Sequence, residues 1–427
     1  MSLGLYISVP FCRTKCSYCN FASDVFSRAA FKRYVERICA DMANAPGLAE
    51  QMGGRFDRSV NSIYLGGGTP TVLDVTHLER LFVTIRQNFD LAKEIEITVE
   101  CAPGTLSLDI LDALCGCGVN RISLGVQSFV DGEAAAVGRL HKRETVLDDI
   151  RRLRAAGISN LNIDLIAGLP HQTAKSWEYS LAEMIATGVP HASVYMLEVD
   201  EDSRLGRELI AGGTRYHAHF VPDEDVVADF YLAACERLEK GGLRQYEISN
   251  FCGKGFESRH NLKYWTRQPY LGFGVDAHSM LEAAVDPYVQ VRAAEHDTRQ
   301  GLGGSAPCEA VAAEIEAVRF STADSLEDFL VAKPMNRVPV TRPEALEETF
   351  FLGLRLTRGL DLARVAKEFG RDAVAQFEDA MVEFERAGLL ERRGEVIRLT
   401  PRGRLLSNEV FSGLISGGDE KIGAGRS

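Results

Sequence analysis

The chain has 427 residues, a length that predicts two or three domains. Its formal net charge is −12, and 45% of its residues are hydrophobic and 25% charged, as in an ordinary globular protein. This composition disfavours a disordered chain, a membrane protein and a general nucleic-acid binder, because phosphate backbones require a basic surface. Residues 3–9 are apolar but too few for a signal peptide, and no apolar run is long enough to cross a bilayer. We therefore expect a cytoplasmic protein with no transmembrane segment, which could still associate peripherally with a membrane.

Short runs of Ile, Leu and Val alternate with helical patterns along the first 240 residues. The runs are typical of strands that are buried on both faces, and they lie at 3–9, 63–65, 95–99, 122–125, 161–165 and 193–197. The helical patterns lie at 31–42, 77–89, 108–117, 146–156, 177–187 and 226–240. Alternation of this kind indicates parallel strands joined by right-handed crossovers. The sequence therefore predicts an α/β fold, a partial (β/α) barrel of about six parallel strands.

The pattern changes in the last third of the chain. We expect the barrel core over 1–240 and an extension of it over 241–300. Residues 301–342 begin with a Gly-rich stretch and predict a connecting segment. Residues 343–415 predict a smaller, mostly helical domain with a β-hairpin, similar to a winged helix, and 416–427 predict a flexible tail. Acidic residues outnumber basic ones after 343, so nucleic acid is not an expected partner.

Three of the ten cysteines are clustered directly after the first predicted strand, as Cys12, Cys16 and Cys19. Clustered thiolates in a reducing compartment suit a soft metal centre. A structural zinc site normally uses four protein ligands, whereas a [4Fe–4S] cube held by three cysteines keeps one iron open. The local cluster supplies three ligands and no His lies near it in sequence, which favours the cube over zinc. Three unrelated buried cysteines are the alternative. Simple packing is the default for the other seven cysteines.

Polar residues and glycines also follow the other predicted strands. They are the Gly66–Pro70 loop, Glu100, Gln127 and Asp164. In a barrel of parallel strands, the carboxyl ends meet on one face and carry the chemistry. Each feature alone has a plainer explanation, such as a turn for the glycines or a helix cap for a carboxylate. Their joint position at strand ends favours one shared site.

The segment Cys12-x3-Cys16-x2-Cys19 resembles the defining motif of the radical S-adenosylmethionine (SAM) superfamily. The nearer resemblance is to its HemN/HemW family. It extends from about residue 5 to residue 411 and includes the segment 274–279. His278, in that Gly-rich segment, is a further candidate functional residue. The resemblance implies that the three cysteines bind a [4Fe–4S] cluster whose open iron binds SAM, and that Arg139 pairs with the SAM carboxylate. It implies SAM contacts from Tyr6, Tyr18, Gly67, Gly68, Thr69, Glu100, Gln127, Arg139 and Asp164.

The resemblance leaves two functions open, a coproporphyrinogen III oxidase of the HemN type and a haem chaperone of the HemW type. The oxidases carry a further cysteine where this chain has Phe21, and they have an N-terminal extension for which the eleven residues before Cys12 leave no room. Residues 260–265, HNLKYW, match the HNxxYW motif of the chaperones, which makes His260 the candidate haem ligand; a structural histidine beside a core tryptophan is the alternative. We expect a chaperone that passes haem to apo-haemoproteins, with porphyrinogen as the alternative substrate and a homodimer left open.

Overall fold

The computed structural model describes residues 2–284 and 314–415. Six strands lie side by side in chain order in one sheet, and these six are parallel to one another. They are β1 (Leu3–Val9), β2 (Ser59–Gly67), β3 (Asp90–Cys101), β4 (Arg121–Gln127), β5 (Asn160–Ala167) and β6 (His191–Met196). The predicted parallel core is therefore confirmed. It is extended beside β1 by another parallel strand, β9 (Tyr270–Phe273).

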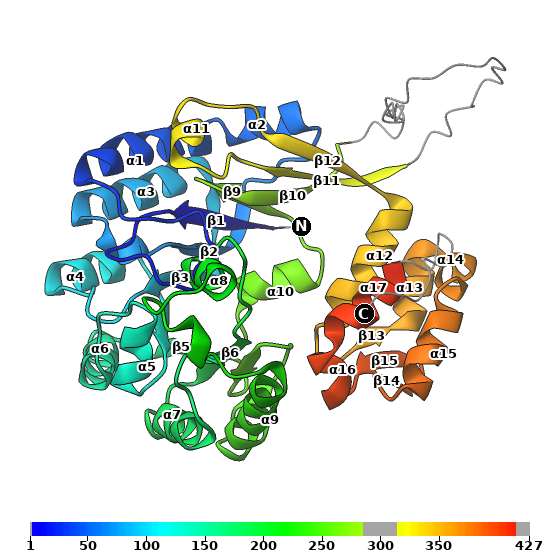
Figure 1. Cartoon of the computed structure of the whole chain (residues 1–427). Coiled ribbons are helices and arrows are strands. Elements are labelled where there is room, and N and C mark those ends of the chain that lie inside the picture. Colours follow the sequence, from blue (N-terminus) through cyan, green and yellow to red (C-terminus); the bar gives the residue numbers. More distant parts are fainter. Residues whose placement is uncertain (1, 285–313, 416–427) are drawn as a thin grey trace, which may run out of the picture.

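Antiparallel strands continue the sheet at both edges, so that it remains open as a partial barrel (Figure 1). Strands β8 (Asn250–Cys252) and β7 (Arg244–Gln245) follow β6 at one edge. Strands β10 (His278–Glu282), β11 (Ile315–Ser321) and β12 (Asn336–Thr341) follow β9 at the other. The sequence predicted a connecting segment over 301–342, but β11 and β12 belong to the sheet. The Gly-rich stretch itself lies outside the described residues.

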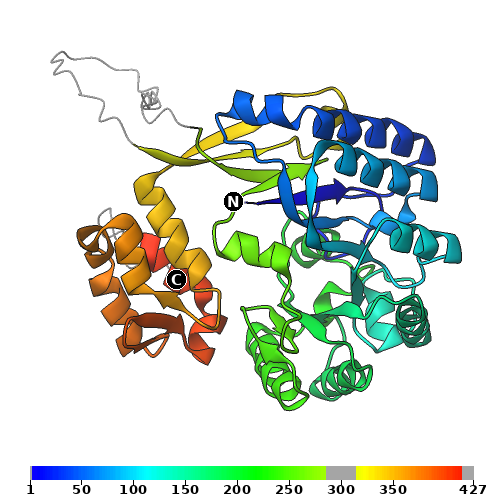
Figure 2. The same cartoon turned by 180° about the vertical axis from the view of Figure 1, so that it is seen from behind.

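Helices cover the outer face of the sheet and leave the carboxyl ends of the strands accessible (Figures 1 and 2). The third helix shows why they form, since its buried Leu78, Leu81, Phe82 and Ile85 recur every three or four residues. The helices of this part are α1 (Arg28–Ala43), α2 (Ala45–Met52), α3 (Val75–Asn88), α4 (Leu108–Gly116), α5 (Asp131–Ala136), α6 (Arg143–Ala155), α7 (Ala174–Ala186), α8 (Arg204–Ala211), α9 (Glu224–Lys240), α10 (Arg259–Trp265) and α11 (Leu326–Leu330). Short 3₁₀ turns η1 (Pro70–Val72) and η2 (Ala218–Phe220) lie in the loops.

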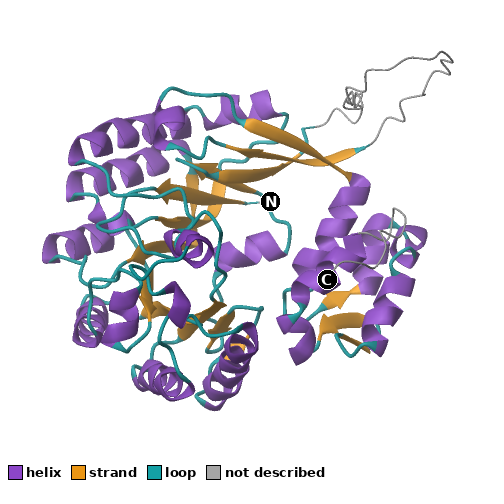
Figure 3. Cartoon of the chain, viewed as in Figure 1, coloured by secondary structure: helices purple, strands orange, loops and turns teal. Residues whose placement is uncertain are grey.

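The C-terminal unit is mostly helical and has its own hydrophobic core, in which Phe350 stacks on Phe377. Its helices are α12 (Arg342–Gly353), α13 (Leu362–Phe369), α14 (Arg371–Ala375), α15 (Glu378–Arg386), α16 (Pro401–Leu405) and α17 (Ser407–Ile415). Its small sheet contains β13 (Leu360–Asp361), β15 (Val396–Leu399) and β14 (Leu390–Arg393). Figure 3 shows the helices packed around this sheet. The expected β-hairpin corresponds to β14 and β15.

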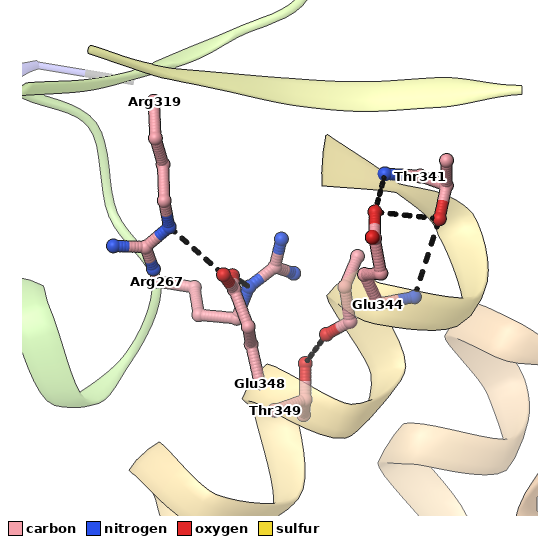
Figure 4. A network of polar contacts seen from close by, with 7 residues as sticks. Arg267, Arg319, Thr341, Glu344, Glu348 and Thr349 are labelled. Atoms are coloured by element: carbon pink, nitrogen blue, oxygen red, sulfur yellow. Dashed lines mark hydrogen bonds and ion pairs between the residues drawn. The ribbon is translucent and has the colours of Figure 1, made fainter. Parts of the chain in front are cut away.

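Helix α12 joins the C-terminal unit to the large sheet. Its Glu348 accepts from Arg267 after α10, at 2.9 Å, and from Arg319 of β11, at 2.8 Å (Figure 4). Just beyond α12, the guanidinium of Arg355 lies over the ring of Trp265, 4.3 Å from its centroid. Helix α10 therefore lies between the two units and contacts both. No helix among the described residues is long and apolar enough to cross a bilayer.

Candidate functional site

The three clustered cysteines line a cavity of about 380 Å³ at the carboxyl ends of the parallel strands. Their loop is folded back by two backbone hydrogen bonds, from Cys12 N to Asp24 O at 3.0 Å and from Asp24 N to Pro10 O at 2.9 Å. Cys16 is buried, whereas Cys12 and Cys19 are partly exposed. The loop therefore presents three free thiols to one cavity.

The arrangement of the thiols bears on the kind of metal centre. Within the described ranges, no three His, Cys, Asp or Glu side chains are grouped so as to hold a metal ion. A mononuclear zinc site is therefore not supported. In an iron–sulfur cube each thiolate binds a different iron, so its ligands are spaced more widely than those of one ion. The donor set of three free thiols around one cavity suits the cube.

The glycine loop after β2 is pressed against the cysteine loop. Gly68 N donates to Val9 O, and Thr69 N donates to Phe11 O, both at 2.8 Å. A Cβ at Gly68 would lie 2.7 Å from Val9 O and 2.8 Å from Phe11 O. Only glycine permits this approach, and here it serves the protein's own backbone. The loop thereby brings the Thr69 hydroxyl to 3.9 Å from the Cys12 thiol.

Two half-buried carboxylates extend the wall of the cavity. Glu100 accepts from the Tyr64 hydroxyl at 2.8 Å and from Gly67 N at 3.2 Å. Burial raises the pKa of Glu100 to about 7. Asp164 accepts from Asn162 Nδ2 at 2.7 Å, and burial likewise raises its pKa. Both carboxylates can therefore accept hydrogen bonds from amino or hydroxyl groups of a ligand.

Gln127 and Arg139 line the same cavity and have unused hydrogen-bonding atoms. Among the described residues, Gln127 Oε1 and Arg139 Nε are buried without a partner. Gln127 also has a left-handed backbone, with φ of 70°. Arg139 Nη2 donates to the Tyr18 hydroxyl at 3.0 Å. Buried polar atoms without partners are uncommon and require an explanation, which a polar ligand with a carboxylate would supply. The residues present thus fit SAM next to a cluster.

Tyr6 lies elsewhere than its predicted partners. Its ring stacks on Tyr64, with centroids 6.2 Å apart, and lines a neighbouring cavity of about 260 Å³. The cluster cavity, by contrast, is lined by Tyr18, Gly67, Gly68 and Thr69. Gly67 belongs to the walls of both cavities. The role of Tyr6 beside SAM stays a prediction.

His260 is enclosed in the protein. It is 1% exposed, and its Nδ1 lies 3.0 Å from Ser62 Oγ while its Nε2 lies 2.8 Å from the Tyr264 hydroxyl. Burial, with a smaller contribution from Lys263, lowers the pKa of the imidazole to about 3. Both nitrogens of a neutral ring are thus engaged. The histidine joins β2 to α10, and a role in binding iron would require one of these contacts to break.

Several residues of the site carry no motif that the sequence reveals. Tyr64 and Ser123 hold Glu100 and Asp164 through hydrogen bonds from the neighbouring strand. Asn162 holds Asp164 from two residues earlier on the same strand, β5. Because alternate residues of a strand face the same side of the sheet, these three could have been predicted to face the same side as the carboxylates once the parallel order was assumed. Cys101 lines the cluster cavity beside Glu100 but is buried. Cys308 falls outside the described residues.

Comparison with known proteins relates the chain to one superfamily over most of its length. Residues 6–184 match the radical SAM superfamily, and residues 340–406 match the HemN C-terminal domain. The heme chaperone HemW of Bacillus subtilis is 32% identical over 414 residues, 96% of this chain and 98% of the relative. HemW of Lactococcus lactis is 30% identical over 411 residues, 95% of each chain. The solved structure of coproporphyrinogen III oxidase HemN from Escherichia coli has a TM-score of 0.76 at 22% identity, covering 97% of this chain and 90% of that one.

Proposed function

Because this chain belongs to the HemW family of the radical SAM superfamily, we propose that it is a haem chaperone that delivers haem to apo-haemoproteins. Relatives of nearly equal length bear the name heme chaperone HemW, which supports the proposal. The observation that carries the cofactor assignment is the cavity that unites three free thiols with the buried, unpaired Gln127 Oε1 and Arg139 Nε.

The chain's own groups have distinct tasks in this proposal. Cys12, Cys16 and Cys19 would hold the cluster. Arg139 would pair with the SAM carboxylate, because a guanidinium offers two parallel donors to such a group. Glu100 would accept from the SAM amino group. When bound together, a reduced cluster and SAM supply one-electron and radical chemistry, whose reactive parts belong to the cofactors.

Gln127 and Asp164 lie further along the same wall and would accept from hydroxyl groups of SAM. Asp164 is held in place by Asn162 and Ser123. Tyr18 orients Arg139 through its hydroxyl. Gly67, Gly68 and Thr69 close the wall beside the cysteine loop. We propose a cytoplasmic setting, with apo-haemoproteins as recipients and a homodimer as one form of the chaperone.

Oxidation of a porphyrinogen is the second candidate, favoured because nearly all of the residues predicted to contact SAM line one cavity. Phe21 stands against it, since the oxidases carry a cysteine at the matching position. An oxidase should form protoporphyrinogen and 5′-deoxyadenosine from coproporphyrinogen and SAM under anaerobic reduction. A chaperone should form no porphyrin product.

The deciding experiment is haem binding followed by transfer. The full chain, reconstituted anaerobically with and without iron and sulfide, is titrated with haem and then mixed with an apo-haemoprotein. We expect stoichiometric binding, and transfer that depends on the cluster. Absence of haem binding by the reconstituted chain, together with formation of a porphyrin product, would establish the oxidase instead.

A further inference from the structure

The second cavity is a neighbour of the cluster cavity that the proposed cofactor site leaves unused. Gly67 and Phe21 line both cavities. Its volume of about 260 Å³ is slightly below the roughly 300–1,000 Å³ of pockets that enclose small ligands. Because a haem is larger than this cavity, one part of it would be enclosed and the rest would remain exposed. Such partial enclosure suits a molecule that must be handed on.

The wall of the second cavity is aromatic. Tyr6, Tyr264 and Tyr270 contribute to it, and the ring of Tyr264 meets that of Tyr270 edge-on, with centroids 4.7 Å apart. Burial raises the pKa of the Tyr6 and Tyr264 hydroxyls well above their usual range, so both rings stay neutral. Phe21 is 62% exposed and adds an apolar face at the boundary between the two cavities. Aromatic faces of this kind are suited to the flat apolar surface of a porphyrin.

Among the described residues that line this cavity, His278 is the only histidine. Its side chain is 67% exposed, and its Nε2 lies 3.6 Å from Asp276 Oδ1. Histidines that bind metals commonly donate their other ring N–H to a carboxylate, which fixes the tautomer and the ring orientation. Here a small approach of the ring to Asp276 would complete that hydrogen bond and leave Nδ1 free for a metal.

The loop that carries His278 is fixed by its surroundings. Asp276 N donates to Ala323 O at 2.8 Å, and Ala277 N donates to Thr322 Oγ1 at 2.9 Å. The same Thr322 hydroxyl bonds to Gly274 O at 2.5 Å. These contacts tie the segment before β10 to the turn after β11. The imidazole is therefore exposed on a backbone that is held in place.

His260, unlike the exposed His278, is enclosed by the protein. Its two nitrogens are bonded to Ser62 and Tyr264, and its ring contributes to the wall of neither cavity. Its partner Tyr264, however, lines the second cavity. The HNLKYW segment can thus shape the cavity through Tyr264 while His260 supports that tyrosine from behind.

We propose that haem binds against the second cavity and that His278, rather than His260, coordinates its iron. Asp276 positions the imidazole, and Phe21 and Tyr264 contact the macrocycle. This inference rests on the proposed haem chaperone function and names the site of its cargo.

Haem spectroscopy of the full, cluster-loaded chain tests the assignment. The wild type, His278→Ala and His260→Asn are titrated with haem, and the Soret band and electron paramagnetic resonance spectrum of each complex are recorded. Replacement of His278 should weaken binding at least tenfold and abolish the histidine-ligated signature, which added imidazole should restore. His260→Asn should retain the signature, and His219→Ala, an exposed histidine of η2, is the matched control for nonspecific surface ligation.

The outcomes separate the two proposals. If the wild type binds no haem, the chaperone function itself fails. If the wild type binds haem and His278→Ala has the same spectrum and affinity, the function stands and the assignment of His278 is wrong. Loss of the signature in His260→Asn with an unchanged thermal melting curve would also overturn it. Asp276→Asn, which suits the left-handed backbone at that position (φ of 52°), should keep the ligand but shift the haem reduction potential.

Discussion

The close approach of the glycine loop to the cysteine loop predicts a large effect of one methyl group. In Gly68→Ala the new Cβ would lie 2.7 Å from Val9 O, 2.8 Å from Phe11 O and 3.0 Å from Phe11 N. All three neighbours are backbone atoms, so the loops must separate by several tenths of an ångström. Overpacking of this kind costs about 1–3 kcal/mol, and weakening of the two backbone hydrogen bonds beside it acts in the same direction.

Two measurements test this reasoning. Urea unfolding of the cluster-free chain should show a loss of about 1–3 kcal/mol, and iron and sulfide analysis after anaerobic reconstitution should show reduced cluster content. Gly132→Ala in α5 is the matched control, because a Cβ there meets nothing within 4 Å and alanine favours a helix by roughly 0.5–1 kcal/mol. The reasoning is refuted if Gly68→Ala unfolds and reconstitutes as the wild type does.

Other predictions concern Arg139, Glu100 and the contact of Glu348 between the large sheet and the C-terminal unit. Arg139→Met should weaken SAM binding by about 10- to 100-fold in calorimetric titration, since a charged hydrogen bond is lost; unchanged affinity would remove Arg139 from the site. Between pH 4.5 and 7 the folded chain keeps a proton on Glu100 that the unfolded chain releases, so this carboxyl lowers the free energy of unfolding as the pH rises. Glu100→Gln should therefore gain stability relative to the wild type from pH 5 to pH 7 in urea unfolding, and a constant difference would contradict the raised pKa. Glu348→Gln should lose roughly 1–3 kcal/mol of unfolding free energy because two arginines lose their partner, whereas Glu347→Gln, which has no ion pair among the described residues, should change little.

The parallel core could be predicted from the sequence because each strand contains a short stretch that is buried on both faces. Such strands appear as short apolar runs, and the helices between them repeat a period of three to four. β11 was missed for a different reason. Its Ala317, Val318 and Phe320 are buried in the sheet, but a Gly-rich stretch precedes them and favours a linker. An antiparallel strand near the edge of a sheet, such as β11, has no repeating strand–helix unit around it that would identify it.

The residues of the site likewise include some that the sequence could predict and some that it could not. Cys12, Cys16 and Cys19 are close in sequence, and Glu100 and Asp164 follow from the rule that strand ends converge. The side of a strand that a residue faces is harder to predict. Tyr6 lies on β1 near the cysteines in sequence, yet it lines the second cavity. For His260 the motif contains one of its partners, Tyr264, which lies four residues further along the same helix. The other partner, Ser62, is distant in sequence and is identified only by the folded structure.

The position of Trp265 gives this protein a natural fluorescent reporter. The chain has two tryptophans, and Trp177 is 1% exposed with its indole N–H bonded to Phe230 O. Replacing Trp177 with phenylalanine would leave emission from the indole beneath Arg355, at the joint between the sheet and the C-terminal unit. Separation of the units would hydrate that indole and shift its emission to longer wavelength. Haem bound beside the neighbouring Tyr264 would instead quench it by energy transfer, so a single emission band would distinguish opening of the joint from arrival of the cargo.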